Sequence, residues 1–317
     1  MANTITASEW SPTISAIAIT GASGFIGQAL LPVLSAAGHQ CLGLSRQPQP
    51  GMQRVNYQSR AQLVSLLAGQ ECLVHLAGVA HNPTAREADY QAGNVQLTAQ
   101  ITKAAKEAGI HQVILISSIK AMGEQTPPGQ PFTAEALCRP EDAYGRSKLA
   151  TEQEFISLCE RFQLQWTIIR PPLVYHPSAK GNIERLANAI KAGQWLPFKG
   201  ADNQRDWVSL AVLNDLILTC IDNPAAHQQI FLASDGQPLS TEAMANRLAA
   251  DLGLSAKLFK LPRLVRLLMR IIPGLARTEQ KLFGNLTLDI RHTTETLAWQ
   301  PKCSDGDHQA SVNPLAK

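Results

Sequence analysis

The chain has 317 residues, of which 45% are hydrophobic and 17% are charged. This composition is typical of a globular protein, and the length suffices for one large domain with an added lobe or for two domains. The 28 basic and 25 acidic residues leave a net charge of +3, which gives no reason to expect nucleic acid as a partner.

Cysteine and histidine usage narrows the class of protein further. The six cysteines are scattered without a Cys-x-x-Cys pair, which predicts reduced thiols in a cytoplasmic protein. The eight histidines lack the spacing of metal ligands, so no metal site is expected. The N-terminal stretch lacks the pattern of a signal peptide, and no apolar stretch is long enough to span a bilayer.

Short apolar runs alternate with helical patterns through the first half of the chain. The runs predict buried strands at 16–20, 40–45, 72–78, 111–118 and 166–170. The intervening patterns predict helices over 25–37, 60–67, 87–108 and 143–161. This strict alternation predicts an α/β fold, with a doubly wound parallel sheet covered by helices on both faces.

The pattern becomes less regular after residue 175, which predicts a smaller C-terminal lobe. Helices are expected at 181–192, 211–221 and 240–252, with brief strands near 206–208 and 229–233. The segment 261–277 predicts a single amphipathic surface helix bracketed by Pro262 and Pro273. Contact of this helix with a membrane surface or a partner is the alternative.

A glycine-rich loop, TGASGFIG at 20–27, lies between the first expected strand and helix. Gly21 suits a tight turn, Gly24 lets backbone amides approach a diphosphate, and Gly27 lets the helix pack against the strand. The helix N-terminus then stabilises the anion. The loop therefore predicts a nicotinamide dinucleotide site that includes Gly21, Ser23, Gly24, Phe25, Ile26 and Gly27, and a plain strand–turn–helix is the alternative.

The end of the second strand indicates which dinucleotide is bound. An acidic residue there would favour NAD, whereas an arginine accommodates the 2′-phosphate of NADP. The sequence has Ser45 and Arg46 with no acid nearby, so NADP(H) is favoured. An Arg46 side chain that faces solvent and stacks on adenine is the alternative, and it leaves NAD open.

Tyr144 and Lys148 are four residues apart in an expected helix, so both lie on one helix face. A neighbouring ammonium favours the phenolate, and we expect it to lower the pKa of Tyr144. Tyr144 can then exchange a proton with a carbonyl oxygen as hydride is transferred. The helix follows a strand that ends in Ser117-Ser118, at the sheet edge where such folds place ligands.

Together these motifs resemble the extended short-chain dehydrogenase/reductases, the NAD-dependent epimerase/dehydratase family, over about residues 15–300. The matching pieces are TGASGFIG, HLAG (75–78), Asn94 in GNVQLT, the ISS strand end, YGRSK, RPPLVY (170–175) and RDWV (205–208). The resemblance implies a Rossmann fold. It also implies that Ser118 is the catalytic hydroxyl, Tyr144 the acid/base and Lys148 its modulator.

The resemblance extends to binding residues. It implies that the cofactor also contacts Leu76, Ala77, Gly78, Asn94, Lys148 and Pro171. For the substrate it implies Ser118, Lys120 and Tyr144, with Asn182 and Arg205 at the diphosphate of a nucleotide-sugar. The alternatives are a helix N-cap for Asn182 and a surface salt bridge with Asp202 or Asp206 for Arg205. The acid that the family often uses to hold adenine is missing from NYQSR (56–60).

The same resemblance sets the expected domain organisation. Residues 1–15 are expected to be a flexible leader and 16–175 the NAD(P)-binding Rossmann domain. Residues 176–300 are expected to form mainly the substrate-binding lobe, and 301–317 a polar tail. Family members often form homodimers through two helices of the nucleotide domain. The Ala-rich helices at 87–108 and 143–161 suit that role, and packing within one chain explains the same pattern.

Within the family, the residues after Ser118 and at Arg46 favour one chemistry. Sugar 4,6-dehydratases carry an Asp–Glu pair where this chain has Ile119-Lys120, so dehydration is not expected. Exchangeable NADPH suits a net reductase. The stretches SSIKAMGE, RPPLVY and PFKG (197–200) also resemble bacterial 4-ketoreductases, which implies a UDP-linked 2-acetamido-2,6-dideoxy-4-keto sugar as the substrate. A nucleotide-sugar 4-epimerase with bound NAD, a reductase of a non-sugar carbonyl and a non-catalytic NADP-binding sensor are the alternatives.

Overall fold

The computed structural model describes residues 15–82, 84–176, 179, 181–272 and 274–302. Seven strands, all parallel, form the main sheet in the order β10-β6-β5-β4-β1-β2-β3. They are β1 (Ala16–Thr20), β2 (Gln40–Ser45), β3 (Gln53–Arg54), β4 (Cys72–His75), β5 (Gln112–Ile116), β6 (Gln165–Arg170) and β10 (Gln229–Leu232). The order reverses between β1 and β4, which is where such sheets open a ligand crevice.

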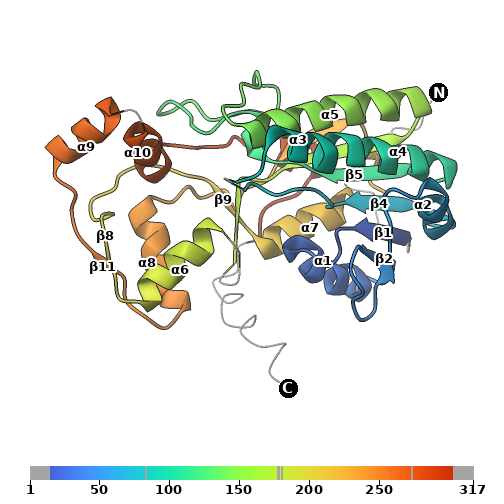
Figure 1. Ribbon diagram of the computed structural model, residues 1–317, viewed down its shortest axis with the longest axis horizontal. Coiled ribbons are helices and arrows are strands. Elements are labelled where there is room, and N and C mark those ends of the chain that lie inside the picture. Colours follow the sequence, from blue (N-terminus) through green and yellow to red (C-terminus); the bar gives the residue numbers. More distant parts are fainter. Residues whose placement is uncertain (1–14, 83, 177–178, 180, 273, 303–317) are drawn as a thin grey trace.

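Helices cover both faces of this sheet (Figure 1). One face carries α1 (Phe25–Ala36) and α7 (Leu210–Cys220). The other carries α2 (Arg60–Leu67), α4 (Leu97–Glu107) and α5 (Ala143–Phe162). The central strands are almost fully buried because a parallel sheet is covered on both sides. The predicted doubly wound Rossmann architecture is confirmed.

The predicted strands 72–78 and 111–118 are shorter in the structure, where β4 ends at His75 and β5 at Ile116. The residues beyond these ends leave the sheet and form the crevice. The helix predicted over 87–108 is also not continuous. It comprises α3 (Glu87–Tyr90), a π-helical segment at Gln91–Gln96 and α4.

The second half of the chain forms a lobe beside the sheet, on the left in Figure 1. Its helices are α6 (Asn182–Lys191), α8 (Thr241–Asp251), α9 (Arg263–Ile271) and α10 (Leu275–Phe283). Two short parallel pairs accompany them, β7 (Leu173–Tyr175) with β9 (Trp207–Ser209) and β8 (Trp195–Leu196) with β11 (Lys257–Leu258). This part of the chain also returns β10 to the main sheet beside β6, and α11 (Arg291–Leu297) packs near it.

The helix predicted between Pro262 and Pro273 is confirmed as α9, which ends at Ile271, but it does not continue to 277, because a separate helix, α10, begins at Leu275. Gly274 has a φ of +92°, a conformation that an α-helix does not contain. The predicted leader lies outside the described residues up to residue 14, and the predicted tail lies outside them from residue 303. Within the described ranges no helix is long and apolar enough to cross a membrane.

Candidate functional site

The glycine loop forms a tight, side-chain-free turn between β1 and α1. Gly21 has a φ of +71°, and a Cβ there would lie 2.8 Å from the backbone nitrogen of Ala77. A Cβ on Gly27 would lie 2.6 Å from Cα of Ala22. Gly24 is the N-cap of α1. The loop is therefore a backbone cradle at a helix N-terminus, which fits a dinucleotide diphosphate.

Leu76, Ala77 and Gly78 continue from β4 beside this loop, since β4 pairs with β1. Pro171 follows β6 at the same edge of the sheet, and its carbonyl accepts a hydrogen bond from the Ile119 amide at 2.9 Å. The predicted cofactor residues of these two segments thus lie at the carboxyl ends of β4 and β6, the two strands that flank β5.

Asn94 is buried in the π-helical segment, and its amide is used within the protein. Its Oδ1 accepts from the Val79 amide at 2.8 Å. Its Nδ2 donates to the Ser147 hydroxyl at 3.0 Å and to the Val79 carbonyl at 3.3 Å. Asn94 therefore fastens the segment after β4 to α5, and the extra residue in the helical turn places its side chain there.

β2 ends at Ser45, and the next residue, Arg46, lines a pocket of about 650 Å³. The buried Ser45 hydroxyl donates to Ser23 of the glycine loop at 3.0 Å. Arg46 is exposed and lines the pocket together with Arg54, which pairs with Ser45 in the β2–β3 register. Arg46 directly follows β2 and Arg54 lies in β3, so two guanidinium groups, a kind of group that binds phosphates, line one pocket.

The wall of this pocket also includes Asn56 and Tyr57, where the family's acid is missing. The Tyr57 hydroxyl accepts a hydrogen bond from the Gly21 amide at 3.2 Å, which ties this wall to the glycine loop. Asp89 lines the pocket as well, and its carboxylate is paired with Arg86. Arg54 was not predicted as a cofactor residue from the sequence. Its strand, β3, has only two residues and lies in a Pro- and Gly-rich stretch that has no strand pattern.

Tyr144 lies in the first turn of α5, whose N-cap is Asp142. Its hydroxyl hydrogen-bonds Ser118, whereas the buried Ser117 hydroxyl has no hydrogen-bond partner among the residues that the structure describes. Of the two serines at the end of β5, the structure thus brings Ser118 to Tyr144. Lys148 Nζ lies 6.0 Å from the centre of the Tyr144 ring and donates to the Ile116 carbonyl at 3.2 Å.

The electrostatics of this pair differ from the prediction. Burial raises the pKa of Tyr144 well above its ordinary value, although the Ser118 hydrogen bond opposes the shift. The expectation that Lys148 lowers the pKa of Tyr144 is therefore wrong for this structure. Burial also lowers the pKa of Lys148 to about 8. Tyr144 is consequently a neutral hydroxyl at physiological pH, which suits a proton donor.

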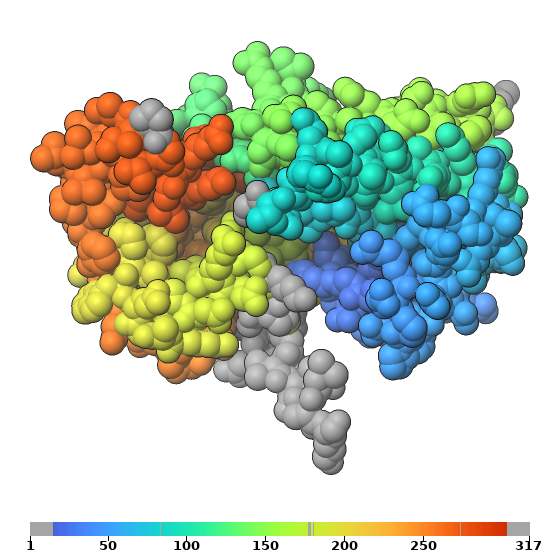
Figure 2. Space-filling view, in the orientation of Figure 1, coloured from blue at the N-terminus to red at the C-terminus, as the bar shows by residue number. Residues whose placement is uncertain are grey.

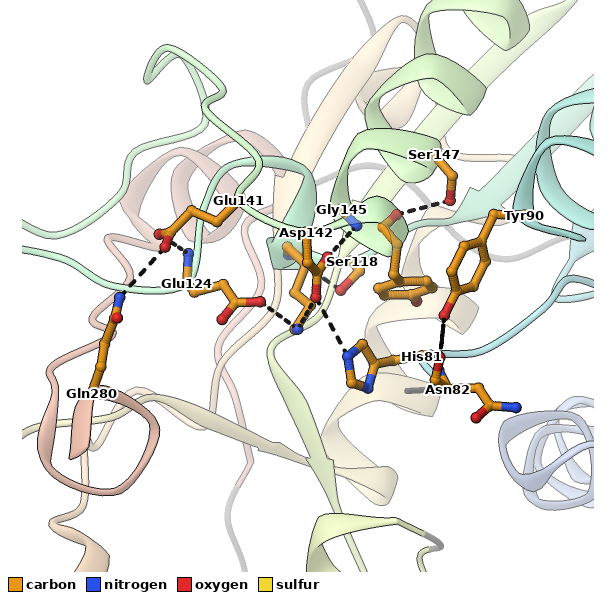
Figure 3. Close-up of polar contacts among 12 residues, drawn as sticks. His81, Asn82, Tyr90, Ser118, Glu124, Glu141, Asp142, Gly145, Ser147 and Gln280 are labelled. Atoms are coloured by element: carbon orange, nitrogen blue, oxygen red, sulfur yellow. Dashed lines mark hydrogen bonds and ion pairs between the residues drawn. The ribbon is translucent and has the colours of Figure 1, made fainter. Parts of the chain in front are cut away.

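Lys120 forms ion pairs with Glu124 and Asp142, and Figure 3 shows these two acids with His81 in one network of polar contacts. Its Nζ is 2.6 Å from Glu124 Oε1 and 2.7 Å from Asp142 Oδ2, and Asp142 also pairs with His81 at 3.4 Å. Burial disfavours the Asp142 carboxylate, but hydrogen bonds from His81, Lys120 and Gly145 lower the pKa of Asp142 below its usual range. The network therefore fixes the start of α5 and with it Tyr144.

Two aromatic rings complete the surroundings of Tyr144. His81 packs edge-on at 5.8 Å between ring centres, and Tyr90 packs at 5.7 Å. His81 and Tyr90 both precede α4, and neither was predicted from the sequence as a neighbour of Tyr144. Asp142 was missed too, although an Asp two residues before Tyr144 has the pattern of a helix N-cap.

Arg205 and Asn182, the predicted diphosphate contacts, lie in the lobe. Arg205 is half-buried and donates to the Gly284 carbonyl at 2.9 Å. Among the described residues it forms no ion pair, so the alternative of a surface salt bridge is wrong. Asn182 is the exposed first residue of α6, and Gly181 is the N-cap, so the alternative of an Asn182 cap is also wrong.

A buried ion pair lies one turn beyond Lys148. Glu152 accepts from Arg170 Nε at 3.0 Å and from Arg170 Nη2 at 2.6 Å, and both side chains are almost fully inaccessible. The charge of Glu152 raises the pKa of Lys148 and so opposes the effect of burial. This pair joins α5 to β6 directly beneath the proposed catalytic residues.

No group of three or more His, Cys, Asp or Glu side chains suits a metal ion within the part of the chain that the structure describes.

Comparisons with known proteins agree with this geometry. The model of the NAD dependent epimerase/dehydratase family matches residues 17–233. A UDP-glucose 4-epimerase from Vibrio cholerae is 38% identical over 234 residues, which cover 72% of this chain and 71% of the relative. The solved structure of a UDP-glucuronic acid 4-epimerase from Bacillus cereus in complex with NAD is also similar. It superposes with a TM-score of 0.73 at 19% identity, covering 91% of this chain and 94% of that one.

A second solved structure, a UDP-N-acetylglucosamine 4-epimerase from Bacillus cereus, superposes with a TM-score of 0.74 at 18% identity. That superposition covers 92% of this chain and 95% of the other. At such identities the structures show a shared fold, and the family match carries the assignment. The chain belongs to the NAD-dependent epimerase/dehydratase family and is an NAD(P)-dependent enzyme of the extended short-chain dehydrogenase/reductase type.

Proposed function

We propose that the protein catalyses NADP(H)-dependent reduction of a nucleotide-linked 4-keto sugar of the UDP-2-acetamido-2,6-dideoxy-hexos-4-ulose type. The observation that carries this proposal is that Arg46, directly after β2, and Arg54 of β3 line one pocket, whereas an NAD-specific site would have an acid at the end of β2. A 2′-phosphate between two guanidinium groups favours NADPH, which exchanges between turnovers and so supports net reduction.

The residues near Tyr144 support a simple proton path. Bound NADPH supplies the hydride that adds to the C4 carbonyl carbon. The neutral Tyr144 hydroxyl donates its proton to the carbonyl oxygen, and Ser118 hydrogen-bonds the same oxygen or the resulting phenolate. The Lys148 ammonium stabilises the phenolate and holds the nicotinamide ribose. Solvent then returns a proton to Tyr144.

The proposed substrate site lies between the sheet and the lobe. Arg205, Asn182 and Lys120 are its cationic and polar residues, and two of the similar proteins are named for UDP-linked sugars. In this proposal residues 16–175 bind the cofactor and 176–300 mainly the sugar nucleotide. A homodimer through α4 and α5 and a cytoplasmic location stay predictions that size measurement and fractionation test.

A nucleotide-sugar 4-epimerase is the second candidate, favoured by the name of the 38% identical Vibrio cholerae relative. An epimerase recycles NAD⁺ within each turnover and keeps it bound, whereas a reductase consumes NADPH. Cofactor released by denaturing the purified protein, together with a thermal-shift panel of NAD⁺, NADP⁺, UDP, dTDP and GDP sugars, tests both candidates. Stabilisation by NADP⁺ and UDP supports the reductase, and stoichiometric bound NAD⁺ contradicts it.

Removing the two arginines should change the choice of cofactor. We expect Arg46→Ala and Arg54→Ala each to raise the KM for NADPH about 10- to 100-fold, because each removes a charged hydrogen bond worth about 1.5–3 kcal/mol. The KM for NADH should change little. Steady-state kinetics with both cofactors measures this. Arg161→Ala, an exposed arginine near the end of α5, is the matched control, and equal effects on NADPH and NADH would refute the proposal.

The pH dependence of kcat/KM should report the ionisation of Lys148. Its pKa is lowered to about 8, so the ammonium is present below that pH and is lost above it. We expect kcat/KM to fall as pH rises through about 8, because the free enzyme then lacks the charge beside Tyr144. Lys148→Arg should remove this limb, since a guanidinium stays charged. A wild-type profile that stays flat from about pH 7 to about pH 10 would contradict the assignment.

A further inference from the structure

Helix α9 exposes an unusual amount of apolar surface. Seven large apolar side chains in and just after this helix are between 40% and 68% exposed. They are Leu264, Val265, Leu267, Leu268, Ile271, Ile272 and Leu275, and we call them the α9 surface. No residue of α9 is buried. Contiguous exposed apolar patches on soluble proteins mark interaction sites.

The orientation of α9 is inverted relative to an ordinary surface helix. Its arginine side faces the protein, where Arg266 and Arg270 both donate to the buried Glu279 of α10, at 3.2 and 3.0 Å. Arg266 also lies over the Phe283 ring at 4.3 Å. Leu264, Leu267, Leu268 and Ile271 share the opposite side, because residues three or four apart lie on one helix face. The apolar side thus points to solvent at one end of the molecule (orange in Figure 2).

The charge around this surface is strongly positive. Residues 257–281 contain seven Lys or Arg and one acid, a net charge of +6 in a chain whose total is +3. The single acid is Glu279, with which Arg266 and Arg270 of α9 already form internal ion pairs. The remaining cations, including Arg263 and Arg277, are exposed and flank the apolar side. The rest of the chain therefore carries a net charge of −3.

We propose that the α9 surface docks on an anionic lipid bilayer. An exposed apolar helix face flanked by arginines matches the structure of a membrane interface, where apolar side chains enter the acyl boundary and arginines contact phosphate headgroups. Docking against a second copy is disfavoured, because it would bring two segments of charge +6 together. An anionic bilayer can bury the apolar side chains of α9 and at the same time pair its phosphate groups with the flanking cations.

Docking would place the membrane beside the proposed substrate site. Helix α10 leads into Gly284, whose carbonyl accepts from Arg205. Gln280 of α10 donates to Glu141 at 3.4 Å, and Glu141 accepts from the Glu124 amide at 3.2 Å (Figure 3). Hydrogen bonds thus connect α10, next to the docking helix, with Glu124, which forms an ion pair with Lys120. The site would then work at the surface of a bilayer.

Vesicle flotation with the full chain tests the proposal. Vesicles of about 70% phosphatidylcholine and 30% phosphatidylglycerol are compared with pure phosphatidylcholine, at low and at physiological salt. We expect binding to the anionic vesicles and at least tenfold less to the neutral ones. Leu264→Ser/Leu268→Ser/Ile271→Ser should reduce binding at least tenfold. Arg263→Gln/Arg277→Gln should reduce it on anionic vesicles only, by about fivefold for each charge.

A matched control and a size measurement complete the test. Leu137→Ser/Leu254→Ser removes exposed leucines elsewhere and should float like the wild type. Failure to bind anionic vesicles at low salt, or equal binding by the triple variant, would overturn the proposal. The proposal would also be overturned if the protein does not bind vesicles but forms a dimer or a complex with another protein, and if only the triple variant loses that assembly. Thermal stabilisation by NADP⁺ in every variant shows that the fold is intact and separates this test from that of the proposed function.

Discussion

Tyr144→Phe is expected to lower kcat about 10²- to 10⁴-fold, because it removes the hydroxyl that donates the proton to the substrate oxygen. The ring stays packed between His81 and Tyr90, so the fold should be unchanged. The KM for NADPH should stay near the wild-type value, since Tyr144 acts on the reacting oxygen. Single-turnover oxidation of NADPH with a 4-keto sugar measures the loss directly.

Tyr90→Phe is the matched control for this substitution. Tyr90 packs against Tyr144, and its hydroxyl donates to the Asn82 carbonyl at 2.9 Å. Removing that hydroxyl should change kcat only a few-fold, because it bonds to backbone outside the Ser118–Tyr144 pair. A loss in Tyr90→Phe as large as that in Tyr144→Phe, or an active Tyr144→Phe, would contradict the proposed proton donor.

Glu152→Ala is expected to destabilise the fold by about 3–5 kcal/mol, because it leaves the Arg170 guanidinium buried without its partner. Urea unfolding followed by circular dichroism measures the free energy of unfolding. Glu154→Ala, an exposed acid on the same helix, is the control and should change stability by less than about 0.5 kcal/mol. A Glu152→Ala variant as stable as this control would refute the structural role of the pair.

The same pair should also influence catalysis. Glu152 raises the pKa of Lys148, so Glu152→Gln should lower that pKa further. The loss of kcat/KM at high pH should then begin at a lower pH than in the wild type. The free energy of unfolding should change with pH in the opposite direction to kcat/KM. The folded-state pKa of Lys148 lies below its unfolded value, so the unfolded chain binds more protons, and stability rises with pH from about 8 to about 10.5.

Local pattern was enough to predict the frame of the molecule. Short apolar runs bounded by Gly or Pro predicted the strands, and β1 and β2 have the predicted bounds. The glycine spacing predicted the cradle because it follows from steric limits on the backbone. The Tyr144 and Lys148 spacing likewise predicted a shared helix face. Such features depend on residues close in sequence, which is why one sequence suffices to find them.

Features that depend on distant contacts were missed. Arg54 reaches the Arg46 pocket only through the pairing of β3 with β2. The Glu152–Arg170 pair joins a helix to a strand, and neither residue signals the other in the sequence. The pKa of Tyr144 was predicted in the wrong direction because spacing shows which charges are near but does not show burial.

The lobe illustrates a third limit. The sequence predicted an amphipathic helix over 261–277, but the usual assumption is that the apolar side of such a helix faces the core. The buried Glu279 instead holds the arginine side of α9 inward. Only the position of an acid on the next helix decides this orientation, and hydrophobic periodicity carries no information about it.

The most direct test of the proposed function is the stoichiometry of NADPH consumption. The purified protein is mixed with NADPH and UDP-2-acetamido-2,6-dideoxy-hexos-4-ulose, and the absorbance of NADPH is followed while the sugar nucleotides are separated. We predict that one NADPH is oxidised for each keto sugar reduced, and that Tyr144→Phe abolishes both changes. Interconversion of UDP-sugars at C4 by protein-bound NAD⁺, without net consumption of NADPH, would contradict the account and identify an epimerase.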